Sequence, residues 1–352
     1  MTETSPQAIQ TALNAGSIHK ALWLRGSRLG DFLFTTPALA AFRERWPKVE
    51  VNLLTNPYTQ ELAQLCPLFS KILVFQGKES SLAGREGDRI AQRIQSIFGE
   101  TQLLLAPRPR PEISAFAKKM GVPYVFPPDT GQGEDRDSHV VVQTWRRFAT
   151  LDLPPPGPLV LKAPDEGHPL LAQLSTPPIL LHPGCDESAR WRFRRGVARR
   201  LWPLGHWKAL AIGLKKWGRT AVFVSGTKRE GRWIHRFLKR EGLHFPHLQG
   251  LSLPLLAGTM AQSQALIGVD SGPLHLATAL GLPSIGLYGP SPVSFTGPWS
   301  QNGSSRVIQK PLPCSPCQGK GVHCPRNVCM EEIQPEEALE ALRTLLQTVS
   351  HT

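Results

Sequence analysis

Two aspartates, each between a short apolar run and a segment that favours a helix, are well placed to do chemistry. Asp31 follows Gly30 after the apolar run 18–24, and Asp270 follows the run 265–269. A nearby helix start favours the ionised carboxylate, which is the form a general base needs before it accepts a proton. Helix capping is the alternative role for Asp31.

Asp270 opens a turn of small residues. Ser271 and Gly272 follow it, and Pro273 suits a first helical turn because its missing N–H would have no partner there. A helix start presents free N–H groups and the positive end of the helix dipole, which suits a diphosphate. The turn therefore indicates a phosphate site, and the alternative is an ordinary strand–helix turn that binds nothing.

Short apolar runs alternate with helix-like segments on both sides of the proline-rich segment 151–158. The runs lie at 18–24, 49–54, 72–75, 103–105, 179–181, 220–224, 265–269 and 284–288. We expect a loose tail before the first run, and a glycine-containing turn followed by one helix over residues 25–47. This alternation predicts two α/β halves, each with a parallel sheet covered on both faces. Because the prolines cannot sustain a helix or a central strand, we expect segment 151–158 to be the linker, with a ligand cleft between the halves.

The composition favours an anionic partner. The chain has 352 residues and a net charge of +13, which suits nucleic acid, an acidic membrane surface or a phosphorylated substrate. Residues 1–17 lack the pattern of a signal peptide, and no apolar stretch approaches the roughly 18–20 residues of a membrane helix. We therefore expect a cytoplasmic protein, at most peripheral to a membrane.

An arginine-rich stretch at 190–203 carries six arginines, with Trp191, Phe193 and Trp202 between them. Arginine forks match phosphate oxygens, so the stretch predicts a phosphate clamp or a nucleic-acid strip, and a solvated loop is the alternative. His182 and Gly184 lie just before it at the end of a predicted strand, where a ligand loop belongs.

Two further clusters could hold a metal. Asp135 and Asp137 form an Asp-x-Asp among loop residues, which favours a solvated loop, and we assign no metal there. Four cysteines within sixteen positions indicate a structural zinc, with an iron–sulfur cluster, a redox disulfide or buried thiols as alternatives. These are Cys314, Cys317, Cys324 and Cys329.

Several stretches together resemble glycosyltransferase family 9, the lipopolysaccharide heptosyltransferases. They are the turn 25–31 with Thr36 and Pro37, the stretch 270–275 through Gly289 and Pro290, His182-Pro183-Gly184, and Arg200-Leu201-Trp202-Pro203 with Trp207. The cysteine run ending at Met330 is similar to the tail of the heptosyltransferase II branch. Arg200 stands where the family usually has a lysine.

The resemblance implies a GT-B fold, with two Rossmann-like domains facing a central cleft. The expected parts are an acceptor-binding domain 1–157, a nucleotide-sugar domain 158–334 with the cysteine-rich segment 314–329, and a helix 335–352 packing back across the hinge. It also implies inverting, metal-independent transfer of heptose from ADP-heptose to the lipopolysaccharide inner core, at the inner-membrane surface and without nucleic acid. Asp31 would be the base, beside the acceptor-side residues Ser27, Arg28 and Gly30. The donor side would comprise His182, Gly184, Arg200, Asp270, Ser271, Gly272, Pro273 and His275.

Two alternatives remain. A family 9 transferase could use another nucleotide sugar or another acceptor. A zinc-containing nucleic-acid-binding protein would instead bind DNA or RNA with an affinity that falls steeply with salt.

Overall fold

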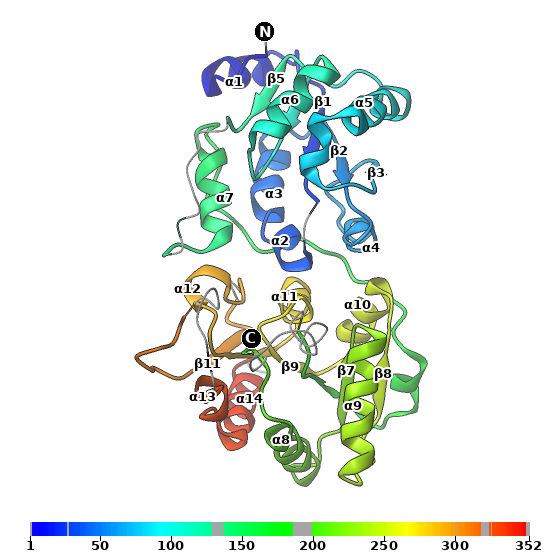
Figure 1. Cartoon of the computed structure of the whole chain (residues 1–352), viewed down its shortest axis with the longest axis vertical. Coiled ribbons are helices and arrows are strands. Elements are labelled where there is room, and N and C mark those ends of the chain that lie inside the picture. Colours follow the sequence, from blue (N-terminus) through cyan, green and yellow to red (C-terminus); the bar gives the residue numbers. More distant parts are fainter. Residues whose placement is uncertain are drawn as a thin grey trace. The chain divides into compact units, whose positions relative to one another are not determined.

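A computed structural model describes residues 2–26, 28–128, 135, 137–185, 199–300, 302–317, 324 and 326–349. The chain divides into two compact units, Met1–Lys162 and Ala163–Thr352. Each unit contains one sheet in which all paired strands are parallel, with helices packed around it (Figure 1). The predicted α/β fold class is therefore confirmed.

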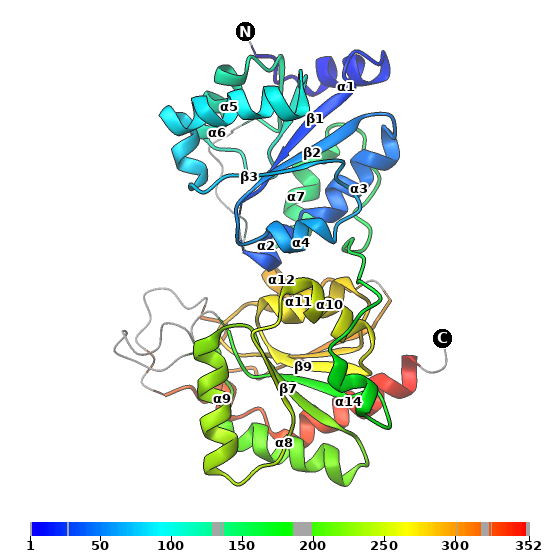
Figure 2. The same ribbon diagram turned by 90° about the vertical axis from the view of Figure 1, so that its right-hand side faces the viewer.

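The sheet of unit 1 has the strand order β3-β2-β1-β4-β5. Its strands are β1 (Lys20–Leu24), β2 (Glu50–Thr55), β3 (Ile72–Val74), β4 (Leu103–Leu105) and β5 (Tyr124–Phe126). Its helices are α1 (Pro6–Asn14), α2 (Leu29–Leu33), α3 (Thr36–Arg45), α4 (Gln60–Gln64), η1 (Glu79–Ala83), α5 (Arg85–Phe98), α6 (Pro111–Met120) and α7 (Val140–Ala149). Helices α5 and α6 pack together on one face of the sheet, and α3 and α7 on the other (Figure 2).

The sheet of unit 2 has the order β11-β10-β9-β6-β7-β8. Its strands are β6 (Ile179–His182), β7 (Ala221–Ser225), β8 (His247–Gln249), β9 (Ala265–Val269), β10 (Ser284–Tyr288) and β11 (Ser305–Gln309). Its helices are η2 (Pro169–Gln173), α8 (Leu204–Lys216), α9 (Lys228–Arg240), α10 (Leu253–Ala261), α11 (Gly272–Ala279), α12 (Val293–Thr296), α13 (Val328–Glu331) and α14 (Pro335–Val349). Helices α8, α9 and α14 cover one face, and α10 and α11 cover the other (Figure 2).

Strand burial explains why the sequence shows continuous apolar runs. Every residue of β6, β7, β9 and β10 is buried. A parallel strand with helices on both faces has no solvent side, so it gains by being apolar throughout.

Both sheets have a point where the chain reverses the direction in which it adds strands. In unit 1 this switch point lies between β1 and β4, and in unit 2 it lies between β6 and β9. At such a point the loops leave the sheet to opposite sides, and their separation opens a crevice outside the carboxyl ends of the strands. Asp31 comes after β1. His182 is the last residue of β6, and Asp270 comes directly after β9. The topology thus brings predicted site residues to both switch points.

Two local expectations were wrong. The N-terminal segment, expected as a loose tail, forms α1, whose start is capped by Ser5 and carries Pro6 in its first turn. Residues 25–47, expected to contain one helix, contain α2 and α3. Pro37 lies in the first turn of α3, where a proline is tolerated, whereas inside one continuous helix it would remove a backbone hydrogen bond.

The C-terminal helix α14 contacts α8 and the strands β10 and β11 of unit 2. Its predicted return across the hinge stays a prediction. No helix in the described part of the chain combines the length and the apolar character needed to span a bilayer.

Candidate functional site

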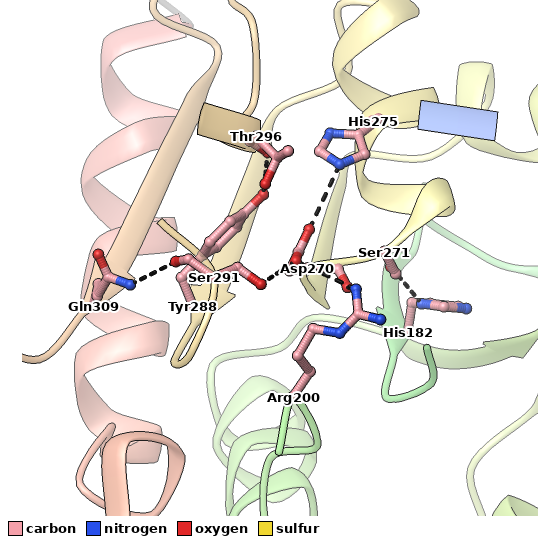
Figure 3. A network of polar contacts seen from close by, with 9 residues as sticks. All are labelled: His182, Arg200, Asp270, Ser271, His275, Tyr288, Ser291, Thr296 and Gln309. Carbon is pink, nitrogen blue, oxygen red and sulfur yellow. Dashed lines mark hydrogen bonds and ion pairs between the residues drawn. The ribbon is translucent and has the colours of Figure 1, made fainter. Parts of the chain in front are cut away.

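The donor-side residues predicted from the sequence meet around Asp270, at the switch point of unit 2 (Figure 3). The Nη1 atom of Arg200 donates to the backbone carbonyl of Asp270 at 3.2 Å and to its Oδ2 at 3.3 Å. The Nε2 atom of His275, from α11, lies 3.7 Å from Oδ1. Ser291, in the loop after β10, donates its hydroxyl to Oδ2. Arg200, Asp270 and His275 thus lie in one network.

This network keeps Asp270 ionised although its side chain is only 10% exposed. Burial alone would raise the pKa of its carboxyl group. The hydrogen bond from His275 and the charge of Arg200 outweigh burial, and the pKa falls from 3.8 to about 2. Burial and the nearby Asp270 charge raise the pKa of Tyr288, which stays a neutral phenol and donates to the carbonyl of Thr296 at 2.9 Å. The site therefore holds a negative carboxylate against one arginine.

Ser271 and His182 join the ends of β9 and β6. The hydroxyl of Ser271 and Nδ1 of His182 share a hydrogen bond of 3.2 Å (Figure 3). Burial lowers the pKa of His182, against a smaller opposing effect of the Glu230 charge, so the imidazole is neutral at pH 7. Ser271 is also the N-cap residue of α11, but its side chain makes no capping bond. The start of α11, with Gly272 and Pro273, thus lacks a side-chain cap from Ser271.

Asp31 lies in the first turn of α2, at the switch point of unit 1. The N-cap position belongs to Arg28, so the capping interpretation of Asp31 is wrong. Its backbone carbonyl accepts from Nη2 of Arg25 at 3.2 Å. The carboxylate is half-buried, and within the described residues it has no hydrogen bond or ion pair. Gly30 and Arg28 flank it as expected, and Ser27 lies outside the described residues.

Comparisons with known proteins show what the chain is similar to. The family model described as glycosyltransferase family 9 (heptosyltransferase) matches residues 189–326. Lipooligosaccharide heptosyltransferase 2 of Campylobacter jejuni is 23% identical, over 93% of this chain and 98% of its own length. The chain is thus similar to glycosyltransferase family 9, through the family model over part of its length and through this relative over most of it. These similarities identify it as a glycosyltransferase.

Two solved E. coli structures share the fold of this chain. The ADP-heptose lps heptosyltransferase II has a TM-score of 0.71 and 20% identity, covering 94% of this chain and 99% of that one. The heptosyltransferase WaaC with ADP has a TM-score of 0.66 and 16% identity, covering 93% and 99%. The predicted GT-B type is thereby confirmed as the fold class.

Glu230 lies beside the candidate site, next to Gly184, and sequence reasoning missed it. It is buried at the start of α9, and its Oε2 accepts from the backbone N–H of Gly226 at 2.8 Å. Thr227 and Glu230 form a capping box, a Thr-x-x-Glu pattern that is readable in the sequence just after an apolar run. The carboxylate also lies against Gly184, in the loop just after β6.

Gly184→Ala should disturb this arrangement. A methyl group there would lie 1.1 Å from Oε1 and 2.1 Å from Cδ of Glu230, so the carboxylate must move. We expect a loss of roughly 1–3 kcal/mol in the free energy of unfolding, together with weaker ADP binding. Urea unfolding and calorimetric titration would measure both. Gly205→Ala, with nothing within 4 Å, is the control. Equal behaviour of the two variants would contradict the assignment.

Two anchors hold the loops that carry Ser291 and Arg200. The side-chain amide of Gln309, in β11, donates to the carbonyls of Gly289 and Ser291, each at 2.9 Å. In the turn after Arg200, the Trp202 indole donates to the carbonyl of Ile333 at 2.9 Å, and the Asn327 amide donates to the carbonyl of Leu201 at 2.7 Å. Contacts from β11 and from the C-terminal segment therefore position the loops whose side chains, Ser291 and Arg200, contact Asp270.

The four clustered cysteines differ in their environments. Cys314 is exposed, Cys317 and Cys324 are half-buried, and Cys329 is buried. Burial, reinforced by the neighbouring cysteines, raises the pKa of the Cys329 thiol to about 11. Among the described residues, no group of three or more candidate ligands could hold a metal. These four side chains do not fit a zinc site as they lie, and the structural zinc stays a prediction.

Two other predicted clusters fall partly outside the described residues. Asp135 is exposed, and its carboxylate accepts from the backbone of Asp137 at 2.9 Å and from the Ser138 hydroxyl at 2.6 Å. These contacts agree with the predicted solvated loop. Of the arginine-rich stretch, residues 190–198 lie outside the described part of the chain, so of its arginines only Arg199 and Arg200 are described.

Proposed function

We propose that this enzyme transfers heptose from ADP-heptose to the inner core of lipopolysaccharide. Similarity to family 9 supports the reaction class, and the names of its relatives support the donor and acceptor. The observation that carries the proposal is the constellation of Arg200, Asp270 and the start of α11 at the switch point of unit 2. Such a constellation suits a sugar joined to a diphosphate.

On the donor side, the start of α11 at Ser271, Gly272 and Pro273 would face the diphosphate. Arg200 would move part of its interaction from Asp270 to a phosphate oxygen, while Asp270 and His275 would hold the donor. His182 and Gly184 would line the opposite side of the crevice. Positive charge from Arg200 and the helix start would stabilise ADP as it departs. In other nucleotide-sugar enzymes a metal ion provides this positive charge. Its provision by the protein supports metal-independent transfer.

On the acceptor side, Asp31 would be the general base. An acceptor hydroxyl oxygen forms the new bond to the anomeric carbon, the bond from that carbon to the diphosphate oxygen breaks, and the hydroxyl proton passes to the Asp31 carboxylate. Attack opposite to the leaving group inverts the anomeric centre. The available carboxylate of Asp31 supports this role, and Arg28 beside it would favour an acidic acceptor sugar. The proposal requires Asp31 and the donor-side residues to act on the same pair of bound substrates.

A panel of nucleotides tests the donor assignment. We expect ADP to bind saturably and more tightly than UDP, GDP or CDP, and ADP to be released only when both ADP-heptose and a heptose-deficient lipopolysaccharide acceptor are supplied. Tighter binding of another nucleotide would instead favour the alternative of a family 9 transferase with a different donor. Steeply salt-dependent binding of DNA without ADP binding would favour the nucleic-acid alternative.

Chelation separates the catalytic and structural roles of a metal. We expect the rate of transfer to be unchanged by an excess of EDTA, because Arg200 and the start of α11 provide the charge. Circular dichroism and metal analysis of the same samples serve as the control. A lost rate with intact folding would contradict metal-independent transfer. Unfolding in EDTA would instead point to a metal held by the four clustered cysteines.

We also propose that the enzyme acts in the cytoplasm, at the surface of the inner membrane, because its acceptor belongs to a lipid. The net charge of +13 supports attraction to an anionic surface.

A further inference from the structure

Helix α9 has one apolar side and one strongly basic side. The apolar side places Ile234, Phe237 and Leu238 against the sheet, next to β7 and β8. The helix has thirteen residues and six cations, which are Lys228, Arg229, Arg232, Arg236, Lys239 and Arg240. Its acidic residue, Glu230, is buried and points away from this surface. The solvent side of α9 is therefore cationic along its length.

Four of these cations form a continuous row with a spacing of four residues, which we call the basic row. It consists of Lys228, Arg232, Arg236 and Arg240, and all four are exposed. Side chains four residues apart on a helix are neighbours, and like charges at that spacing disfavour the helix. Lys228 also lies in the first turn, where the helix dipole disfavours a cation. Folding alone therefore gives no reason for the row.

Within the described part of the fold, ion pairs leave three of the four cations of the basic row unneutralised. Arg240 pairs with Glu241 at 3.0 Å. Lys228, Arg232 and Arg236 have no ion pair within the described residues. A similar row on α5, formed by Arg85, Arg89 and Arg93, differs because Glu86 and Asp88 lie on the same helix. The repulsion along α9 would be relieved by an external anionic surface.

We propose that the basic row of α9 docks the enzyme on an anionic phospholipid bilayer. The helix is about 20 Å long, so it can lie along the bilayer with its cations among lipid phosphates. A membrane is favoured over a single-stranded nucleic acid because the row exposes no aromatic ring for bases to stack on, since Trp233 packs against the core. The choice also rests on the proposed function, whose acceptor is a lipopolysaccharide.

Vesicle sedimentation tests the proposal on the full chain. The vesicles are phosphatidylcholine alone, or phosphatidylcholine with roughly one third phosphatidylglycerol. We expect binding only to the anionic vesicles at about 0.1 M salt, and release at about 1 M salt. Each basic residue near an anionic surface strengthens binding about fivefold. The triple variant K228Q/R232Q/R236Q should therefore bind roughly a hundredfold more weakly.

A matched control removes the same charge from the other helix. The variant R85Q/R89Q/R93Q lowers the net charge equally and should keep most of the vesicle binding. Both variants should unfold at the wild-type temperature or slightly above it, because the replaced cations support no described ion pair. Transfer to a soluble, truncated acceptor should be unchanged by the α9 triple substitution, which separates this surface from the proposed reaction.

Three outcomes would overturn the proposal. Equal loss of binding in the two triple variants would mean that net charge, not α9, determines attachment. Absence of wild-type binding to anionic vesicles would mean that α9 is not a membrane-docking surface. Tighter binding to an oligonucleotide than to vesicles, lost in the α9 variant, would assign the row to nucleic acid. Loss of vesicle binding in the α9 variant with an unchanged rate of transfer would support docking through α9 and would not affect the proposed heptose transfer.

Discussion

Replacement of Asp31 by asparagine should abolish transfer while ADP binding stays near the wild-type value. The substitution keeps the shape of the side chain but removes the acceptor for the hydroxyl proton. General-base catalysis contributes about 10²–10⁴-fold, so we expect kcat to fall by roughly a thousandfold or more. Measurement of kcat beside calorimetric titration with ADP separates catalysis from donor binding.

An exposed carboxylate of the same unit provides the control for Asp31. Asp88, in α5, pairs with Lys119 at 2.6 Å, and Asp88→Asn should leave kcat within about twofold, because exposed ion pairs contribute little. Turnover by the Asp31 variant at a rate close to that of the Asp88 variant would remove Asp31 from the role of base.

Replacement of Asp270 by asparagine should both destabilise unit 2 and weaken donor binding. The carboxylate is 10% exposed and Arg200 is 20% exposed, so removal of the negative charge leaves a largely buried guanidinium without its ion-pair partner. The shift in the Asp270 pKa from 3.8 to about 2 corresponds to roughly 2–3 kcal/mol of stability at neutral pH. Urea unfolding and ADP titration would detect the two effects.

The stability that the Asp270 carboxylate contributes should depend on pH in a defined direction. Folding lowers the pKa of Asp270, so its contribution is complete above the unfolded value near 3.8 and is lost as pH falls towards 2. The difference in the free energy of unfolding between the wild type and Asp270→Asn should therefore be largest at pH 7 and roughly half as large near pH 3. A difference that grows on acidification would contradict the assignment.

A second substitution separates charge from packing at Asp270. In the Asp270→Asn background, Arg200→Gln should restore part of the stability, because it removes the largely buried charge that Asp270 balanced. Donor binding should not recover, because Arg200 is proposed to hold the phosphates. Ser291→Ala removes one hydrogen bond to the same carboxylate and should cost about 1 kcal/mol.

Much of the second sheet could be predicted from local pattern. The apolar run 265–269, the helix start at Pro273 and the run 284–288 correspond to β9, α11 and β10, because fully buried parallel strands are apolar throughout. Strands β5 and β8 have three residues each and carry no readable period. The five residues of α2 are likewise too few to show a helical period, so the sequence did not separate α2 from α3.

The residues of the site were partly predictable, whereas their partners were not. Asp270, Arg200 and His275 could be named from the sequence, and the structure places them together. Ser291 and Glu230 were missed, because their contacts join segments far apart in the chain and depend on the strand order. For Glu230 the Thr-x-x-Glu pattern offered a signal. For Ser291, only the turn at Gly289 and Pro290 marked the neighbourhood.

The tethering of the turn after Arg200 has a consequence for shortened forms of the chain. Asn327 and Ile333 hold Leu201 and Trp202, and α13 and α14 in turn secure Asn327 and Ile333. A protein ending near residue 326 would keep Arg200, Asp270 and His275 but would lose both of these tethers. We therefore expect a shortened form to hold Arg200 less firmly beside Asp270, so that the smallest form able to bind the proposed donor extends through the last helix.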